Sequence, residues 1–138
     1  MVKRGDIYWI KPGNYVSTGY EIYSDRPAVI VSNNIVNSRM ATFNIVYLTT
    51  ADKKESPARV KVMGSGREST ALCEQIQTVS HERIGEYIGE CTAEELAQID
   101  EALAIELGLT VVPDQKTERE RDTYKILYEA LLEARLNG

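Results

Sequence analysis

Residues 27–32 read Pro-Ala-Val-Ile-Val-Ser, an apolar run of the length typical of a buried strand. Pro27 disfavours the helical conformation at Arg26, so Arg26 is held extended where a loop meets this strand. The asparagine-rich segment 33–38 that follows is expected to be a loop. Several short strands at close spacing predict a mainly β domain, built as a small barrel or a sandwich. Besides the run at 27–32, the expected strands are residues 6–10, 43–48, 58–62 and 71–79.

The last third of the chain carries helical patterns instead. Thr92, with a glutamate three residues later, is typical of a capping box, and Gly108 stands where a left-handed residue ends a helix. We therefore expect a helix over 92–108 that packs on the barrel. Residues 110–116 are expected to be a linker, and 117–138 a further helix whose apolar stripe packs on this domain or on a partner subunit. The apolar face of the first helix comprises Leu96, Ile99, Leu103 and Leu107.

The composition is that of one globular domain, with 138 residues of which 43% are apolar and 27% charged. The sequence has no run of about 18 apolar residues and no apolar N-terminal region, so we expect neither a membrane span nor a signal peptide. Its two cysteines, Cys73 and Cys91, do not form a CxxC pair. They are expected to be reduced thiols of a cytoplasmic protein.

The charges are unevenly distributed, although the net charge of −5 on its own disfavours a nucleic-acid partner. Residues 1–67 hold 10 Lys and Arg against 5 Asp and Glu, a balance of +5. Residues 68–138 hold 6 against 16, a balance of −10, and much of this excess lies in the expected helices. The basic half can attract phosphate groups while the acidic half keeps the chain in solution.

The motifs exclude several classes of enzyme. His81 is the only histidine and lies in an expected exposed turn, so a ribonuclease with two imidazoles as acid and base cannot be built. The sequence has no GxxxxGKS/T phosphate loop, no GxSxG nucleophile elbow and no GxGxxG dinucleotide fingerprint. Acidic residues do not cluster at metal-ligand spacing in the strand-rich half, so we expect no metal and no cofactor.

Polar side chains at strand ends remain as candidates for chemistry. Arg26 presents a planar fork suited to phosphate, although it could instead pair at the surface with Asp25 or Glu21. Thr49 and Thr50 end a predicted strand, where two hydroxyls can donate to a phosphate oxygen or serve only as strand formers.

A second group of candidates lies in the last predicted strand and the first loop. Glu74 and Gln75 interrupt the apolar pattern of their strand, as residues do that face either a ligand or solvent. Three tyrosines of the long loop after the first strand, Tyr15, Tyr20 and Tyr23, can stack on unpaired bases or cover the end of the barrel.

Gly19-Tyr20-Glu21 is followed, five residues after the glutamate, by Arg26-Pro27 at the start of an apolar strand. Together with four further motifs in chain order, over roughly residues 3–109, this pattern resembles the toxins of the MazF/PemK family. The resemblance implies an SH3-like barrel formed by a toxin domain at 1–109. The other matching segments are residues 4–9, 46–50, 72–78 and 83–85, the last with the helix at 92–108.

The resemblance also implies an activity and partners. It implies a metal-independent, sequence-specific endoribonuclease (an mRNA interferase) that cleaves single-stranded RNA by attack of a ribose 2′-hydroxyl. The products would be a 2′,3′-cyclic phosphate and a 5′-hydroxyl. The implied partners are a second copy in a homodimer and a cognate antitoxin, which covers the RNA groove and through which the complex binds DNA. No membrane partner is implied.

Site residues follow from the resemblance by position. Arg26 matches the catalytic arginine and Thr49 the catalytic threonine, while Glu21 matches a loop glutamate and is our candidate base. Two features depart from the family pattern. The loop reads Gly-Tyr-Glu-Ile-Tyr where many members have Gly-Ser-Glu-Gln, which leaves the recognised RNA sequence open, and the chain continues past residue 109. The residues expected to contact RNA are Gly19, Tyr20, Tyr23, Thr50, Glu74 and Gln75.

Two other functions stay open at this level. A toxin of the same fold could act without catalysis by binding a protein such as gyrase, but such a toxin needs neither Arg26-Pro27 nor Thr49. An RNA-binding or adaptor domain that has lost its activity is the other alternative, and the joint presence of Glu21, Arg26 and Thr49 argues against it. A cleavage assay distinguishes both from a ribonuclease.

Overall fold

The computed structural model describes residues 1–13, 25–109 and residue 129. The predicted linker at 110–116 and, apart from residue 129, the predicted helix at 117–138 lie outside the described residues and stay predictions. The same holds for the candidate residues of the first loop, namely Tyr15, Gly19, Tyr20, Glu21 and Tyr23.

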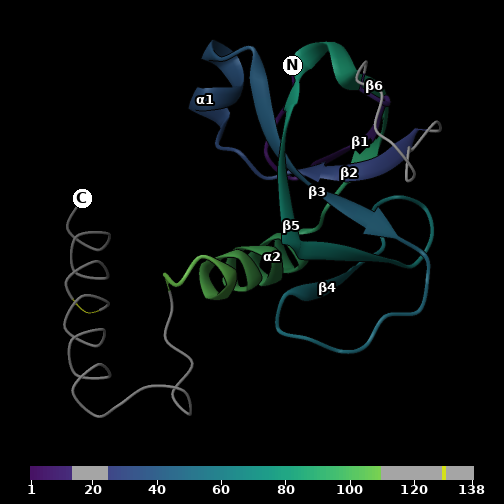
Figure 1. The fold of residues 1–138 in the computed structure, drawn as a ribbon, viewed down its shortest axis with the longest axis vertical. Helices are drawn as coiled ribbons and strands as arrows, with labels where there is room; N and C mark the ends of the chain where they lie inside the picture. The colour runs from purple at the N-terminus through teal and green to yellow at the C-terminus, as the bar shows by residue number, and fades with distance from the viewer. Residues whose placement is uncertain (14–24, 110–128, 130–138) are drawn as a thin grey trace.

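Six antiparallel strands form one sheet in the order β4-β5-β3-β2-β1-β6 (Figure 1). This arrangement confirms the predicted mainly β class with packed helices. All five predicted strands are present, each within two residues of its expected ends. The strands are β1 (Asp6–Ile10), β2 (Arg26–Ile30), β3 (Thr42–Thr49), β4 (Arg59–Val62), β5 (Ser69–Ser80) and β6 (Ile84–Glu90).

The sequence does not predict β6, because its glycines are poor strand formers. The structure shows why residue 85 is a glycine. A Cβ there would lie 2.8 Å from the carbonyl oxygen of Trp9 on the neighbouring strand β1, which is too close. β6 follows a short 3-10 turn, η1 (His81–Arg83), in which His81 is exposed. The exposed turn predicted around His81 is thus confirmed.

The sheet curls until its two edge strands approach each other at glycines. A Cβ on Gly64, just after β4, would lie 2.1 Å from the carbonyl oxygen of Glu90 in β6. A Cβ on Gly89 would lie 2.1 Å from the carbonyl oxygen of Gly64. No strand pairing joins β4 to β6 within the described ranges, so the sheet is open and the word barrel describes only its curvature.

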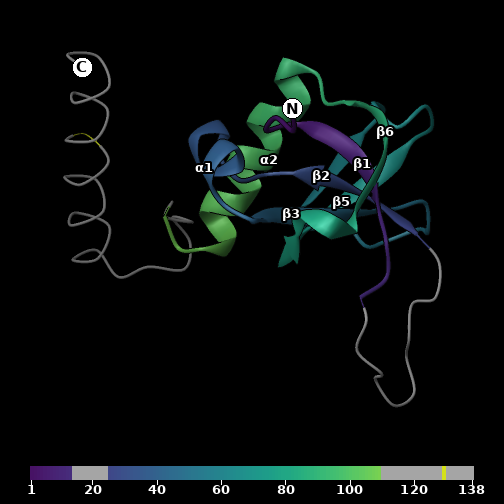
Figure 2. The same ribbon diagram turned by 90° about the horizontal axis from the view of Figure 1, so that it is seen from above.

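One face of the sheet is covered by α2 (Ala93–Glu106), which packs against β4 and β5 (Figures 1 and 2). The predicted capping box is present, because Thr92 Oγ1 accepts the N–H of Glu95 and the Glu95 carboxylate accepts the N–H of Thr92. Gly108 has φ +72°, as expected for the residue that ends the helix. Leu107 was predicted to lie on the apolar face of this helix, but it follows the last helical residue and is exposed, so that part of the prediction was wrong. The core on this face includes Ile7, Val29, Val46, Leu48, Val60, Val62, Ala71, Cys73, Ile99 and Ala102.

The opposite face of the sheet has a core of its own, and it also carries the candidate active site. Its apolar side chains come from β1, β2, β3 and β5, and Val2, Tyr8 and Ile84 pack against them. The buried members are Ile10, Ala28, Ile30, Phe43, Ile45, Tyr47 and Val79.

A short helix, α1 (Asn34–Arg39), occupies the segment predicted to be a loop, so that prediction was wrong. Its asparagines indicate turns by composition, but here they build the helix. Asn33 Oδ1 accepts the N–H of Val36 at 2.9 Å and caps the first turn. Asn37 is buried and donates from Nδ2 to the carbonyl of Ser32 at 2.9 Å. Neither helix of the described ranges, α1 or α2, is long and apolar enough to cross a membrane.

Candidate active site

The strand register aligns polar residues in one row across the sheet. Ala28 is the partner of Tyr47, so continuing this register by two residues sets Arg26 opposite Thr49. Thr49 is in turn the partner of Thr70 in β5, and Thr70 is the partner of Lys61 in β4. Directly opposed residues of antiparallel strands point to the same face. Arg26, Thr49, Thr70 and Lys61 therefore share one face, which is the face that carries Tyr47.

The guanidinium of Arg26 stacks on an aromatic ring. Its guanidinium carbon lies 4.4 Å from the centroid of the Tyr47 ring, and Tyr47 is only 4% exposed. The Tyr47 hydroxyl accepts a long hydrogen bond of 3.4 Å from Arg83, whose Nε donates to the carbonyl of Lys11 at 2.8 Å. Among the described residues no ion pair reaches Arg26, and this includes Asp25, the pairing considered from the sequence. Within residues 1–13 and 25–109, the flat face of the guanidinium is stacked and no carboxylate occupies its edge, where an anion can bind.

Thr49 lies at the end of β3, half-buried, beside the position of Arg26. Its Oγ1 accepts the N–H of Ala51 at 3.2 Å, so the hydroxyl proton stays available for donation. Thr50 is exposed and follows the strand. Of the two threonines predicted at this strand end, the register therefore sets Thr49 opposite Arg26, and Thr50 follows it along the chain.

Glu74 and Gln75 lie in a bulge that bends β5. Between the pairs Val46–Ile76 and Leu48–Ala71, β3 contributes one residue and β5 contributes the four residues 72–75. Bulges of this kind re-aim side chains and often lie next to functional sites. Gln75 is exposed at this bend.

The carboxylate of Glu74 is half-buried and engages a neighbouring cation. Its Oε1 accepts from Nε of Arg59 at 3.3 Å, while Oε2 is buried with no partner among the described residues. Arg59 also donates from Nη1 to the carbonyl of Lys54 at 2.7 Å. Glu74 therefore orders the loop after β3 through Arg59, and an RNA contact by Glu74 stays a prediction.

The first loop starts and ends beside Arg26. Ile10 and Arg26 are partners in the β1–β2 pair, so the loop between them leaves and rejoins the sheet at the same place. Glu21, Gly19, Tyr20 and Tyr23 belong to this loop but lie outside the described residues. Their roles as base and RNA contacts stay predictions.

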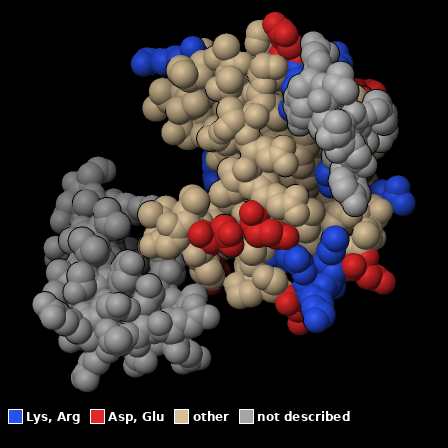
Figure 3. Space-filling view, in the orientation of Figure 1, with Lys and Arg blue, Asp and Glu red and all other residues tan. Residues whose placement is uncertain are grey.

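A basic pocket lies beside the row and was not found from the sequence. It has a volume of about 570 Å³ and lies between β4, the loop before it and Gln98 of α2. Figure 3 shows Lys and Arg side chains gathered over β4, next to acidic side chains on α2. The one signal in the sequence is the density of cations between residues 53 and 61. The basic side chains that line this β4 pocket are Lys53, Lys54, Arg59 and Lys61.

Other reactive groups of the described part do not form a catalytic cluster. Burial, and then the charge of Glu74, raises the pKa of the Cys73 thiol to about 12. Burial, and then the charge of Glu95, does the same for Cys91. Both thiols are therefore neutral near pH 7 and poor nucleophiles. In residues 1–13 and 25–109 no group of three His, Cys, Asp or Glu side chains is placed to hold a metal ion.

Comparison with known families agrees with this geometry. A family model described as PemK-like, MazF-like toxin of type II toxin–antitoxin system matches residues 3–107. The chain belongs to this family. Among curated PemK/MazF relatives, Endoribonuclease EndoA of Bacillus subtilis is 35% identical over 115 residues, which cover 79% of this chain and 97% of EndoA. Endoribonuclease MazF9 of Mycobacterium tuberculosis is 33% identical over 118 residues, which cover 79% of this chain and 98% of MazF9.

A solved PemK/MazF structure has the same fold. It is described as an endoribonuclease in complex with its cognate antitoxin from Mycobacterial species. Its TM-score with this chain is 0.67 and its sequence identity 30%, and the match covers 81% of this chain and all of the other. The fold and the family expected from the motifs are thereby confirmed.

Proposed function

We propose that this PemK/MazF protein is a toxin that cleaves single-stranded RNA as a metal-independent, sequence-specific endoribonuclease. The observation that carries the proposal is the β2–β3 register, which when continued by two residues sets Arg26 opposite Thr49, together with the stacking of the guanidinium on a buried tyrosine. The names of its relatives EndoA and MazF9 support the same activity. The two thiols, buried at Cys73 and half-buried at Cys91, are neutral near pH 7 and so support no competing nucleophile.

The reaction is a transfer of phosphate from one ribose oxygen to another. The 2′-oxygen forms a bond to its own phosphorus and loses its proton to a base, while the bond from phosphorus to the 5′-oxygen breaks. The leaving oxygen takes up a proton, which gives a 2′,3′-cyclic phosphate and a 5′-hydroxyl. No metal is required for this balance of atoms, and DNA cannot react because it lacks the 2′-hydroxyl.

Each site residue has a role in this reaction. Arg26 donates to the non-bridging oxygens, on which charge accumulates in the transition state; such stabilisation is commonly the largest catalytic term. The Thr49 hydroxyl donates to one of these oxygens. Glu21 is our candidate for the base that accepts the 2′-hydroxyl proton. The loop that contains Glu21 begins and ends beside Arg26, which is consistent with such a contact.

Partners follow from the same proposal. A cognate antitoxin would cover the RNA-binding face, in line with the solved relative described in complex with its antitoxin. We propose a homodimer as the functional unit. Its support in this chain is an exposed apolar surface at α1, where Ile35 is 67% exposed and Met40, just after the helix, is 58% exposed. Two sheet edges also have no strand partner in the described part.

The deciding experiment is a cleavage assay on single-stranded RNA with excess EDTA. The protein should cut RNA and leave DNA of the same sequence intact. Arg26→Ala should lower the rate by about 100-fold or more, and Thr49→Ala should also lose most activity, because each removes a donor to the developing charge. Lys3→Ala, an exposed lysine before β1, is the matched control and should cut at the wild-type rate.

Three results would contradict the proposal. Activity that needs added magnesium would reject the metal-independent mechanism. A wild-type rate in Arg26→Ala would reject the assigned site. An intact, folded protein that cuts no RNA would favour a toxin that binds a protein target instead.

A further inference from the structure

We infer that the β4 pocket is a second phosphate subsite, which holds the sugar–phosphate backbone of the RNA to one side of the cleaved bond. The inference rests on the proposed ribonuclease activity and extends the substrate site beyond Arg26 and Thr49. It assigns a function to a basic pocket that neither residue lines.

The pocket continues the row of residues that begins at Arg26. Thr70 lines the pocket and is also the strand partner of Thr49, while Lys61 lines it one strand further along. Neighbouring strands lie about 4.8 Å apart, so the three intervals from Arg26 to Lys61 span about 14 Å along the sheet. An RNA strand laid across β2, β3 and β5 therefore reaches the edge strand β4, where Thr70 and Lys61 form the side of the pocket that faces Arg26.

The charge of the pocket suits an anion. The described residues that line it include four cations and one carboxylate, that of Glu55, which leaves a net positive charge. Arg59 is engaged with Glu74 and with the carbonyl of Lys54, which fixes the loop that carries the two lysines. Lys61 lies 3.5 Å from Glu68, but both side chains are more than 60% exposed, so the pair is weak and Lys61 can exchange it for a phosphate.

The side chains of the pocket favour backbone phosphate over the other parts of RNA. Among the residues that the structure describes, no aromatic side chain lines it, so this part of the site offers no ring on which a base could stack. Lysine is a flexible point charge with three donors, which binds phosphate whatever the base. An acidic peptide could also bind to this positive charge. RNA is favoured because the pocket lies at the end of the row of residues that begins with Arg26 and Thr49.

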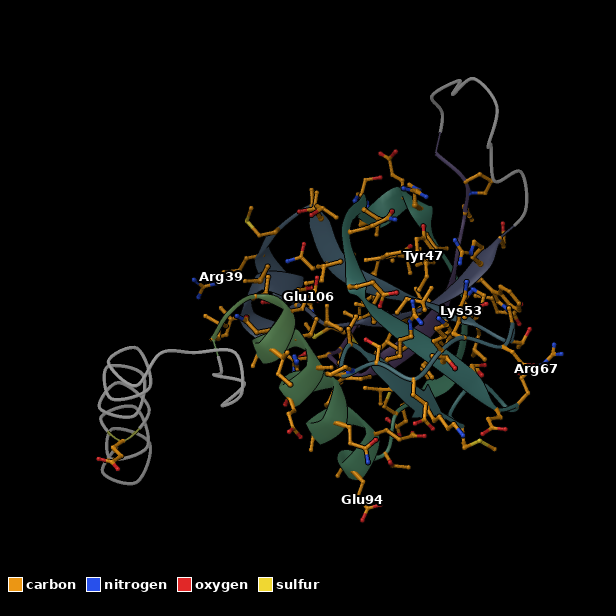
Figure 4. All side chains as sticks on the ribbon, turned by 60° about the horizontal axis from the view of Figure 1, so that its bottom comes forward. Arg39, Tyr47, Lys53, Arg67, Glu94 and Glu106 are labelled. Carbon is orange, nitrogen blue, oxygen red and sulfur yellow. The ribbon has the colours of Figure 1, made fainter. Side chains whose placement is uncertain are left out.

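The test uses the full chain and compares two sets of variants. The pocket variant is Lys53→Gln with Lys61→Gln, and the control is Lys3→Gln. Lys3 is a suitable control because it lies away from the site: it precedes β1 at the Asp6 end, whereas Arg26 pairs with Ile10 at the other end of that strand. Figure 4 shows Lys53 on the same half of the molecule as Tyr47, with Arg39 on the other half. Melting temperatures establish that all variants fold.

The probe is an RNA that the wild-type protein cuts, made uncleavable by a 2′-deoxy sugar at the cut, and its binding is measured by fluorescence anisotropy at several salt concentrations. Each phosphate contact contributes about −0.7 to the slope of log K against log salt for a single strand. The pocket variant should therefore show a slope shallower by about 1.4 and an affinity about tenfold lower at low salt. Its cleavage rate at saturating RNA should stay within about twofold of wild type, since neither lysine belongs to the Arg26–Thr49 pair.

Shortened RNAs locate the contact. Trimming one flank of the cut, 5′ or 3′, should abolish the difference between the pocket variant and wild type, while trimming the other should preserve it. A pocket variant with the affinity and salt slope of Lys3→Gln would overturn the subsite while wild-type cleavage leaves the proposed function standing. So would an equal loss on long and minimal RNAs, or a loss of affinity confined to an acidic peptide of the antitoxin. A wild-type protein that neither binds nor cuts RNA would overturn both proposals.

Discussion

Replacing Tyr47 by leucine tests whether the aromatic ring positions Arg26 for catalysis. The ring is 4% exposed and lies 4.4 Å from the guanidinium carbon, a geometry in which a cation–π interaction contributes about 1 kcal/mol. If this interaction holds the productive orientation, its loss lowers the rate by about fivefold, since 1.4 kcal/mol corresponds to tenfold. The smaller side chain also leaves space in the core around Ala28 and Ile45, which should destabilise the fold by about 2 kcal/mol.

The assay must separate these two effects. Single-turnover cleavage at saturating RNA, at a temperature well below the melting point, reports the rate per folded molecule. Tyr47→Phe is the matched control, because it keeps the ring and removes only a hydroxyl whose hydrogen bond is 3.4 Å long. It should cut at nearly the wild-type rate.

A double-mutant cycle completes the test. In an Arg26→Ala background, Tyr47→Leu should cause no further loss of rate, because the group that the ring positions is already absent. A wild-type rate in Tyr47→Leu would refute the positioning role. A fivefold loss that persists without Arg26 would show that the ring acts through another group.

Three further predictions concern the rest of the molecule. Light scattering at micromolar concentration should return about twice 15.5 kDa, and Ile35→Lys on α1 should shift this mass towards the monomer; a monomeric wild type would reject the homodimer. Truncation after Leu109 should lower the melting temperature or weaken dimerisation and leave the initial cleavage rate similar, whereas a several-fold gain in activity at unchanged stability would identify the C-terminal extension as an inhibitor. The pKa of Cys73 is raised from 9.0 to about 12 in the fold, so the folded state favours the neutral thiol. The stabilisation that this preference gives is complete below about pH 9 and is lost as the pH rises towards 12. Urea unfolding at pH 8 and pH 10 should therefore show a fall of about 1 kcal/mol more in wild type than in Cys73→Ala, and equal falls would contradict the assignment.

Much of the sheet could be predicted because its signals are local. The buried run that follows Arg26 and the alternation in β4 depend on neighbouring residues, and the structure has strands at both. β6 could not be predicted, since the approach of the Trp9 carbonyl that requires glycine at 85 comes from a strand far away in sequence. The helix at 34–39 was missed for a related reason, because asparagine signals a turn unless its side chain finds a helical N–H to cap.

The candidate site likewise has residues that could be predicted from local sequence and others that only the fold brings together. Arg26 and Thr49 could be singled out because each stands at the end of a strand-like run, but their juxtaposition requires the β2–β3 register. The β4 pocket escaped prediction because its lysines come from a loop and an edge strand that read as ordinary charged surface. Glu74 was expected to contact RNA. Its place in the β5 bulge and its ion pair with Arg59 become visible only in the folded structure.

The contact between Gly64 and Gly89 brings the two edges of the sheet together with no ladder of hydrogen bonds between them in the described part. β4 forms one side of this contact and also lines the basic pocket, so a change at the contact would be felt at the pocket. A methyl group added at either glycine would force the two edges of the sheet apart, because the atom it meets is a backbone oxygen that no rotamer change can move. Gly89→Ala should therefore separate β4 from β6 and speed amide hydrogen exchange in these two strands, while β2 and β3 stay protected from exchange. Uniform protection from exchange throughout the sheet would contradict this expectation.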